Sequence, residues 1–372
     1  MRARQISPDI TAPLYYPPGA VGCACGDIGA DNADVVVFHG GPQIWQYANG
    51  QNNVLTPGIT RICFDPKMTS DQRWVAFVVV DGNNMGQIFV YDRSNNQQFQ
   101  LTDTRTGSNR YPWVDYSDGD LWLGWLTNAV DLTPTKNMAG ETAIIYRFRD
   151  GYLRVASWGI HGIFNGNVVT QAIVGRKTVF DSDATNTGYN NHGLRHVYLH
   201  DPDTMENLLI SRNDQGVVLT TGESIQPRAS ANARRIMFQS RATEIVIPQN
   251  ATAGNGEMFV SDLDSGKLYH CTPFYGESAD GYISPDGRLI VFETNAPNVP
   301  GHPPLKPGTM NSFMYDLETG EYTMLNDPVP DDCTWIHGGG HPRVANDGSV
   351  VFNSDIPDGI WRVMLYTEPM VA

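Results

Sequence analysis

The sequence predicts an all-β protein, a single seven-bladed β-propeller with four-stranded antiparallel blades that occupies residues 1–372. Three observations predict this fold. An order of short apolar runs and tight turns recurs along the chain, an aromatic residue marks each copy at intervals of about 40–60 residues, and no interval contains a long amphipathic helical pattern. Four short strands and a loop fill such an interval, which is the size of a propeller blade.

The clearest copy covers residues 284–325. It has a turn at Pro285-Asp286-Gly287, a β-rich run through Phe292, a loop, a second run at 312–316, a turn at Glu318-Thr319-Gly320 and a third run. Asp-Gly and Thr-Gly between apolar runs predict hairpins. Equivalent aromatic anchors occur seven times, at Phe38, Phe77, Trp125, Phe180, Phe238, Phe292 and Phe352.

The remaining copies follow the same order of elements and together fill the chain. They lie at 34–57, 73–103, 121–157, 177–211, 234–272 and 349–368. The last copy stops near Thr367 without a fourth run, whereas the N-terminal segment ARQIS at 3–7 resembles the fourth runs of other copies. We therefore expect residues 1–10 to supply the outer strand of the last blade and to close the ring, which leaves no free sheet edge.

Composition restricts the classes of partner. The net charge of −15, from 25 Lys+Arg against 40 Asp+Glu, argues against a nucleic-acid partner and against an anionic membrane surface. No apolar run is long enough to span a membrane and no secretory leader is visible, so the expected location is the cytoplasm or a virion. The five cysteines form no disulfide framework, and Cys23, Cys25 and Cys63 are expected to be buried thiols.

Two parts of the repeat carry a family resemblance. SPDG at 284–287, separated by four residues from Phe292, and MYDLETGEY at 314–322 resemble the TolB-type, WD40-like (PD40) propeller repeat. The resemblance covers the whole chain and implies the fold. It leaves the function open, because that family includes scaffold proteins, peptidase accessory domains and polysaccharide lyases.

A weaker resemblance, in repeat and length, is to oligogalacturonate lyase. It implies a metal site on the late blades and a separate His base, and Glu277, His337 and His341 lie in the corresponding region. The chain departs from that family because no His precedes blade six and no Gln precedes His337 in the expected place. If a divalent ion binds, Mn²⁺, Zn²⁺ or Ca²⁺ are the candidates.

The fold predicts where a site lies. In a propeller the loops that lead into the innermost strands share a face with the loops between second and third strands. Those loops are long here and rich in Asn, Pro, Gly and Thr, and we call this face the long-loop face; its loops are 127–142, 183–195, 241–257 and 295–311.

The stretch CTWIHGGGHPRVANDG at 333–348 leads into the last blade on this face. Its glycines could bring His337 and His341 together as metal ligands, and Trp335 could stack on a sugar. The alternatives are a bend at the channel rim and a His341 that only bonds a neighbouring strand. His192, His196 and His200 are interpreted as packing or solvent-facing residues, since spacing by four has no ligand geometry on a strand.

Two functions follow from this reading. The leading hypothesis is a non-catalytic binding or structural module that engages a protein or a glycan through the long-loop face, with no cofactor, as a component of a larger assembly such as a virion. The alternative is a metal-assisted polysaccharide lyase that cleaves uronic-acid glycans by β-elimination. In that reaction Arg110 or Arg228 would neutralise the uronate, and Tyr111 or His161 would be the base.

Overall fold

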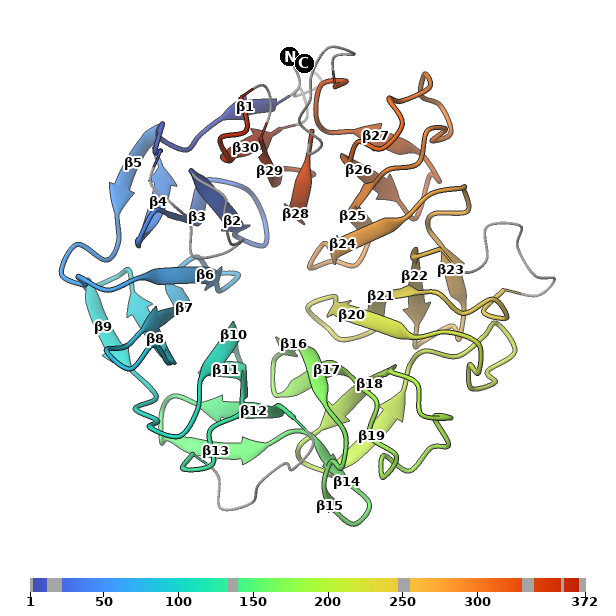
Figure 1. Ribbon diagram of the computed structural model, residues 1–372, viewed down its shortest axis with the longest axis horizontal. Helices are drawn as coiled ribbons and strands as arrows, with labels where there is room; N and C mark the ends of the chain where they lie inside the picture. Colours follow the sequence, from blue (N-terminus) through green and yellow to red (C-terminus); the bar gives the residue numbers. More distant parts are fainter. Residues whose placement is uncertain are drawn as a thin grey trace.

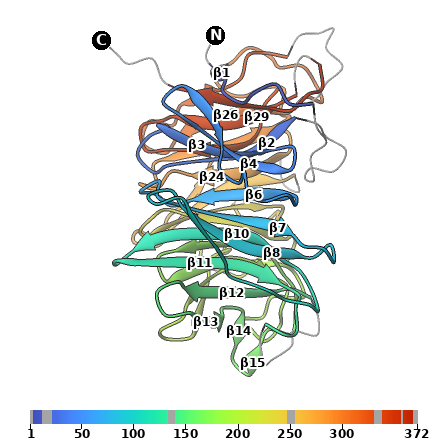
Figure 2. The ribbon, with the colours of Figure 1, turned by 90° about the vertical axis from the view of Figure 1, so that its left-hand side faces the viewer.

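The computed structural model describes residues 3–11, 22–132, 140–246, 255–329, 338–355 and 358–367, and these form seven four-stranded antiparallel sheets around a central axis (Figure 1). The ring is flattened along that axis (Figure 2). In each blade the first strand lies innermost and its successors follow outward. The predicted propeller of seven four-stranded blades is therefore confirmed.

The strands are assigned to blades as follows. Blades 1 to 3 contain β2 (Cys23–Ile28), β3 (Val35–Gly40), β4 (Gln43–Ala48) and β5 (Gln51–Val54); β6 (Cys63–Met68), β7 (Trp74–Val80), β8 (Gly86–Asp92) and β9 (Gln97–Gln100); β10 (Asn109–Ser117), β11 (Asp120–Thr127), β12 (Thr142–Arg147) and β13 (Tyr152–Val155). A two-stranded hairpin of β14 (Trp158–Gly159) and β15 (Gly162–Ile163) follows at the periphery (Figure 1).

The other four blades complete the ring. They contain β16 (Val168–Val174), β17 (Lys177–Ser182), β18 (His196–Asp201) and β19 (Glu206–Leu209); β20 (Ser224–Ala229), β21 (Arg235–Ser240), β22 (Glu257–Asp262) and β23 (Leu268–His270); β24 (Ser278–Ile283), β25 (Leu289–Thr294), β26 (Asn311–Asp316) and β27 (Tyr322–Met324); and β28 (Gly340–Val344), β29 (Val350–Ser354) and β30 (Arg362–Tyr366) with β1 (Ala3–Gln5).

The N-terminal strand closes the ring, as predicted. β1 pairs antiparallel with β30, with Ala3 opposite Tyr366. Beyond the strand, the Ile6 N–H donates to the Val363 carbonyl at 3.0 Å, and the Val363 N–H donates to Ser7 Oγ at 3.1 Å. Blade 7 thus contains both ends of the described chain, and β1 covers the strand edge that β30 would otherwise expose.

The aromatic anchors form the core of the blades. All seven anchors are buried. In three blades the anchor stacks on a Phe of the third strand, with ring centroids 5.9 Å apart for Phe77 and Phe89 and 6.0 Å for Phe238 and Phe259. The same pair recurs in blade 6. Such stacking adds to the area burial and explains why an aromatic occupies this position.

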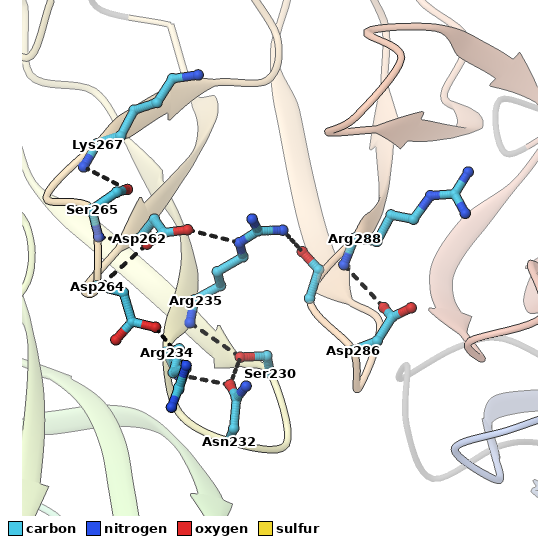
Figure 3. A network of polar contacts seen from close by, with 11 residues as sticks. Ser230, Asn232, Arg234, Arg235, Asp262, Asp264, Ser265, Lys267, Asp286 and Arg288 are labelled. Atoms are coloured by element: carbon cyan, nitrogen blue, oxygen red, sulfur yellow. Dashed lines mark hydrogen bonds and ion pairs between the residues drawn. The ribbon is translucent and has the colours of Figure 1, made fainter.

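An ion pair with an arginine explains why an aspartate ends the third strand in several blades. In blade 5, Arg235 Nε lies 2.9 Å from Asp262 Oδ2, and its Nη1 donates to the Gly287 carbonyl of blade 6 at 3.1 Å (Figure 3). Asp262 ends the third strand and also accepts the backbone N–H of Asp264 and of Ser265. Blades 2 and 6 contain the same kind of ion pair, between Arg73 and Asp92 and between Arg288 and Asp316.

The buried thiols and imidazoles agree with the packing interpretation. Cys23 and Cys63 are buried free thiols, and burial raises the pKa of each to about 12. His196 and His200 are buried on β18, where their Nδ1 atoms contact Ser211 Oγ and Asn207 Oδ1. The side chain of Cys25 lies outside the described residues. Within the described ranges no helix has the length and apolarity needed to cross a membrane.

Candidate functional site

Every innermost strand contains a β-bulge at the same place. The register breaks between Ala24 and Asp27, Phe64 and Lys67, Arg110 and Trp113, Val168 and Gln171, Ile225 and Arg228, Ala279 and Tyr282, and Gly340 and Arg343. In six blades the two bulge residues lie opposite one residue, the aromatic anchor, while in blade 4 they lie opposite Asp181. A bulge re-aims the side chain that it carries.

In five blades the first bulge residue adopts a left-handed backbone and lines a common cavity. These residues are Asp65, Tyr111, Gln226, Asp280 and His341, with φ between 48° and 54°. Each such conformation costs about 1–2 kcal/mol, so the surrounding sheet must hold it. A proline follows the bulge residue in four of them, which fits because an unpaired bulge position needs no N–H.

The cavity has a volume of about 270 Å³ and lies on the axis; we call it the axial cavity. It is lined by Asp65, Lys67, Tyr111, Trp113, Val169, Thr170, Gln171, Gln226, Arg228, Asp280, His341 and Arg343. The bulges are close to the start of the inner strands, and this start pairs with the end of the second strand, as Asn109 does with Thr127. The axial cavity therefore lies toward the long-loop face.

An aromatic partition lies beneath this cavity. Trp113 of blade 3 stacks on Tyr282 of blade 6, with centroids 6.1 Å apart and planes inclined by 11°. Trp113 and Lys67 also line a second cavity of about 100 Å³, to which Tyr282, Asp27 and the far ends of the inner strands contribute. The channel is thus divided into two compartments.

Two arginines border the axial cavity in equivalent positions. Arg228 and Arg343 each donate Nη1 to the carbonyl of the preceding proline, at 2.7 and 2.8 Å. The guanidinium carbon of Arg228 lies 4.9 Å from the Trp113 ring centroid, and that of Arg343 lies 4.9 Å from the Tyr282 centroid. Burial and the charge of Arg343 lower the pKa of Arg228 to about 10, so it remains a cation at neutral pH.

An acid–base cluster forms the wall between blades 6 and 7. His341 Nδ1 lies 3.0 Å from Asp280 Oδ2, and Gln226 Nε2 donates to Asp280 Oδ1 at 3.1 Å. Burial opposes ionisation of Asp280, but the charge and hydrogen bond of His341 hold its pKa well below the ordinary value. Burial and the Asp280 charge raise the pKa of Glu293, on β25, to about 8. Glu293 is therefore a proton donor beside an ionised carboxylate.

The structure brings three of the residues predicted for catalysis or binding into the axial cavity: Tyr111, Arg228 and His341. Arg110 lies at the rim, where its Nε is 2.5 Å from Glu141 Oε1 and its guanidinium carbon is 5.5 Å from the Tyr111 centroid. His161 is exposed in the peripheral hairpin between β14 and β15, and is not among the residues that line the cavity.

The predicted metal ligands are not brought together within the described residues. Glu277 accepts the Gly256 N–H at 2.9 Å and the Gln239 amide at 3.1 Å, and it pairs with Arg241. His337 and Trp335 lie outside the described ranges. No group of three or more His, Cys, Asp or Glu suited to a metal occurs in the part of the chain that the structure describes, so this site stays a prediction.

The sequence reasoning missed most of the cavity, although a signal was present. Four inner strands carry a proline tripeptide: Asp65-Pro66-Lys67, Tyr111-Pro112-Trp113, Gln226-Pro227-Arg228 and His341-Pro342-Arg343. Proline inside a strand is confined to edges and bulges, and each of these strands is the inner edge of its sheet and contains a bulge at the proline. The repeated tripeptide could therefore have located the axial residues.

Comparison with known proteins supports the fold and does not extend to function. No family model and no curated protein sequence matches the chain. Among solved structures it is similar to an oligogalacturonate lyase in complex with manganese, at 12% identity and TM-score 0.62 over 99% of this chain and 98% of that one. Similarity also extends to oligogalacturonate lyase from Vibrio parahaemolyticus, at 12% identity and TM-score 0.60 over 99% and 94% of the two chains.

A third similar structure is the β-propeller domain of the Trilobed protease from Pyrococcus furiosus, at 10% identity and TM-score 0.60 over 94% of this chain and 96% of that domain. That domain is described as having an open velcro topology, whereas β1 closes the ring here. These similarities confirm, at the level of fold, the expected resemblance to β-propellers such as oligogalacturonate lyase.

Proposed function

We propose that this protein is a binding propeller that holds a glycan in the axial cavity, at the centre of its long-loop face. The observation that carries the proposal is the chemistry gathered there by the bulges. Tyr111, 37% exposed, offers an aromatic surface on which a sugar ring can stack. The amide oxygens of Gln171 and Gln226 are buried and have no hydrogen-bond partner among the described atoms, so they can accept sugar hydroxyls.

The size and place of the cavity support the same conclusion. A volume of about 270 Å³ suits one or two sugar rings better than a folded protein domain. The net charge of −15 argues against a nucleic-acid ligand. A glycan or another polar small molecule is then the simplest occupant of the cavity.

Titration of short oligosaccharides, followed by tryptophan fluorescence because Trp113 lines the cavity, tests the proposal. We expect Tyr111→Ala to weaken binding about tenfold, since it removes a stacking surface. Tyr275→Ala is the matched control: Tyr275 lies in the loop leading into β24, is 73% exposed and is not among the cavity-lining residues. Equal affinities for the two variants, or no binding to any glycan, would overturn the proposal.

The alternative, a polysaccharide lyase acting on uronic-acid glycans, is favoured by one arrangement in the same cavity. His341 is paired with Asp280 beside Arg343, which offers a base–acid pair next to a cation. Similarity in fold to an oligogalacturonate lyase also supports it. Lyase activity is tested by the ultraviolet absorbance of unsaturated products, measured on uronic-acid polymers with and without Mn²⁺. Activity lost in His341→Ala supports the lyase, and an unchanged absorbance rejects it.

A further inference from the structure

We propose that Arg228 and Arg343 form a seat for one oxyanion group, so that the ligand of the axial cavity is an acidic rather than a neutral sugar. The proposal deepens the function proposed above and rests on it. Its basis is a contrast between these two arginines and the other arginines of the propeller.

Arginines elsewhere in the blades have carboxylate partners. Arg73, Arg235 and Arg288 each bond an Asp at the end of a third strand, as Figure 3 shows for Arg235. Among the ion pairs of the described residues, none includes Arg228 or Arg343, and the buried Nε of each has no hydrogen-bond partner there. The carboxylates that line the cavity, Asp65 and Asp280, form their ion pairs with Lys67 and His341, and the Asp280 charge acts on both arginines without an ion-pair contact.

The electrostatics favour an anion between the two guanidinium groups. Both are partly buried and line the axial cavity, and the charge of Arg343 is one cause of the lowered pKa of Arg228. Two like charges in a half-enclosed cavity repel each other more strongly than in water. A bound oxyanion removes this repulsion, and guanidinium donors match the geometry of carboxylate and sulfate.

Both side chains are also held in place before any ligand arrives. Their Nη1 atoms donate to the Pro227 and Pro342 carbonyls, and their guanidinium carbons lie over the rings of Trp113 and Tyr282. Binding therefore orders little additional side chain, which improves affinity. Tyr111 is 37% exposed and lines the same cavity, so a ring stacked on it lies in the cavity that the two arginines border.

Carboxylate and sulfate ester share the required chemistry, and the test separates them. Three trisaccharides are titrated into the full chain: one with a uronic acid, its carboxyl-reduced counterpart, and a sulfated analogue. We expect at least one acidic ligand to bind about tenfold or more tightly than the neutral one, and added NaCl to reduce the difference. The tighter acidic ligand then identifies the source of the oxyanion.

The variants assign the effect to the two arginines. Arg228→Gln and Arg343→Gln should each remove most of the preference for the acid, while Arg228→Lys should retain part of it because the charge remains. Arg154→Gln is the matched control, an exposed arginine on β13 whose guanidinium lies over Tyr152. Circular dichroism confirms that each variant is folded.

Two failures are distinguishable. If neutral and acidic glycans bind equally, the seat is wrong although glycan binding stands. If no glycan binds, the proposed function fails, and thermal unfolding with inorganic sulfate decides on the seat: stabilisation that is larger in the unmodified protein than in Arg228→Gln supports it, and equal stabilisation overturns it.

Discussion

Trp113 and Tyr282, from blades on opposite sides of the ring, lie face to face on the propeller axis, with centroids 6.1 Å apart. This stack divides the channel and also orients Arg228 and Arg343, which lie over its two rings. The axial side chains therefore form one unit, to which blades 3, 5, 6 and 7 contribute.

Removing the indole should destabilise the whole ring. Trp113 is only 8% exposed, so Trp113→Ala is expected to lower the free energy of unfolding by about 3 kcal/mol. Trp113→Phe keeps an aromatic face and should cost less than about 1.5 kcal/mol. Urea unfolding of both variants checks this. An alanine variant as stable as the parent would show that the stack contributes nothing.

Ring closure should depend on the first residues. Deletion of residues 1–7 removes the β1 pairing, the bond from the Ile6 N–H to the Val363 carbonyl and the bond from the Val363 N–H to Ser7 Oγ, and exposes the edge of β30. We expect a lower thermal midpoint and concentration-dependent aggregation, measured by light scattering. Arg4→Ala, which removes the bond from Arg4 Nη1 to the Tyr47 hydroxyl and the guanidinium contact with that ring but keeps the backbone of β1, serves as control. A truncated chain that stays monomeric and stable would contradict the prediction.

The left-handed backbone at the bulge should make stability depend on which residue replaces Gln226. Gln226 has a φ of 54°, and its amide bonds Asp280. Gln226→Gly and Gln226→Val both remove that bond, but only valine is strained in this conformation. Valine should therefore be the less stable variant by about 1–2 kcal/mol in chemical denaturation. Equal stabilities would mean that the bulge relaxes at no cost.

Glu293 should make stability fall as the pH rises. Its pKa is raised from 4.5 to about 8 in the folded protein, by burial and by the Asp280 charge. Between these values the folded state holds a proton that the unfolded state has lost. Its contribution is therefore complete below pH 4.5 and is lost as the pH approaches 8.

Glu293→Gln removes this proton uptake and should flatten the slope of stability against pH over that range. Urea unfolding at a series of pH values measures the slope for both proteins. Glu318→Gln, at an exposed turn, is the control for loss of one carboxylate. Parallel slopes for the parent and Glu293→Gln would rule out a neutral Glu293.

The fold could be predicted from sequence because its signals are local. Asp-Gly turns, alternating apolar runs and the buried anchors such as Phe77 and Phe292 depend on residues close together in the chain, and each copy repeats them. The closing strand was predictable for the same reason, since residues 3–7 resemble the fourth runs that they replace.

The site depended on tertiary structure. His341 pairs with Asp280, and Trp113 stacks on Tyr282, because the bulges of six blades bring residues from distant positions of the sequence to one axial cavity. Proline in Gln226-Pro227-Arg228 and His341-Pro342-Arg343 indicates a bulge, but not which side chains will be neighbours. The choice of neighbours is made only when the ring closes, because packing between blades sets the angle at which each inner strand meets the channel.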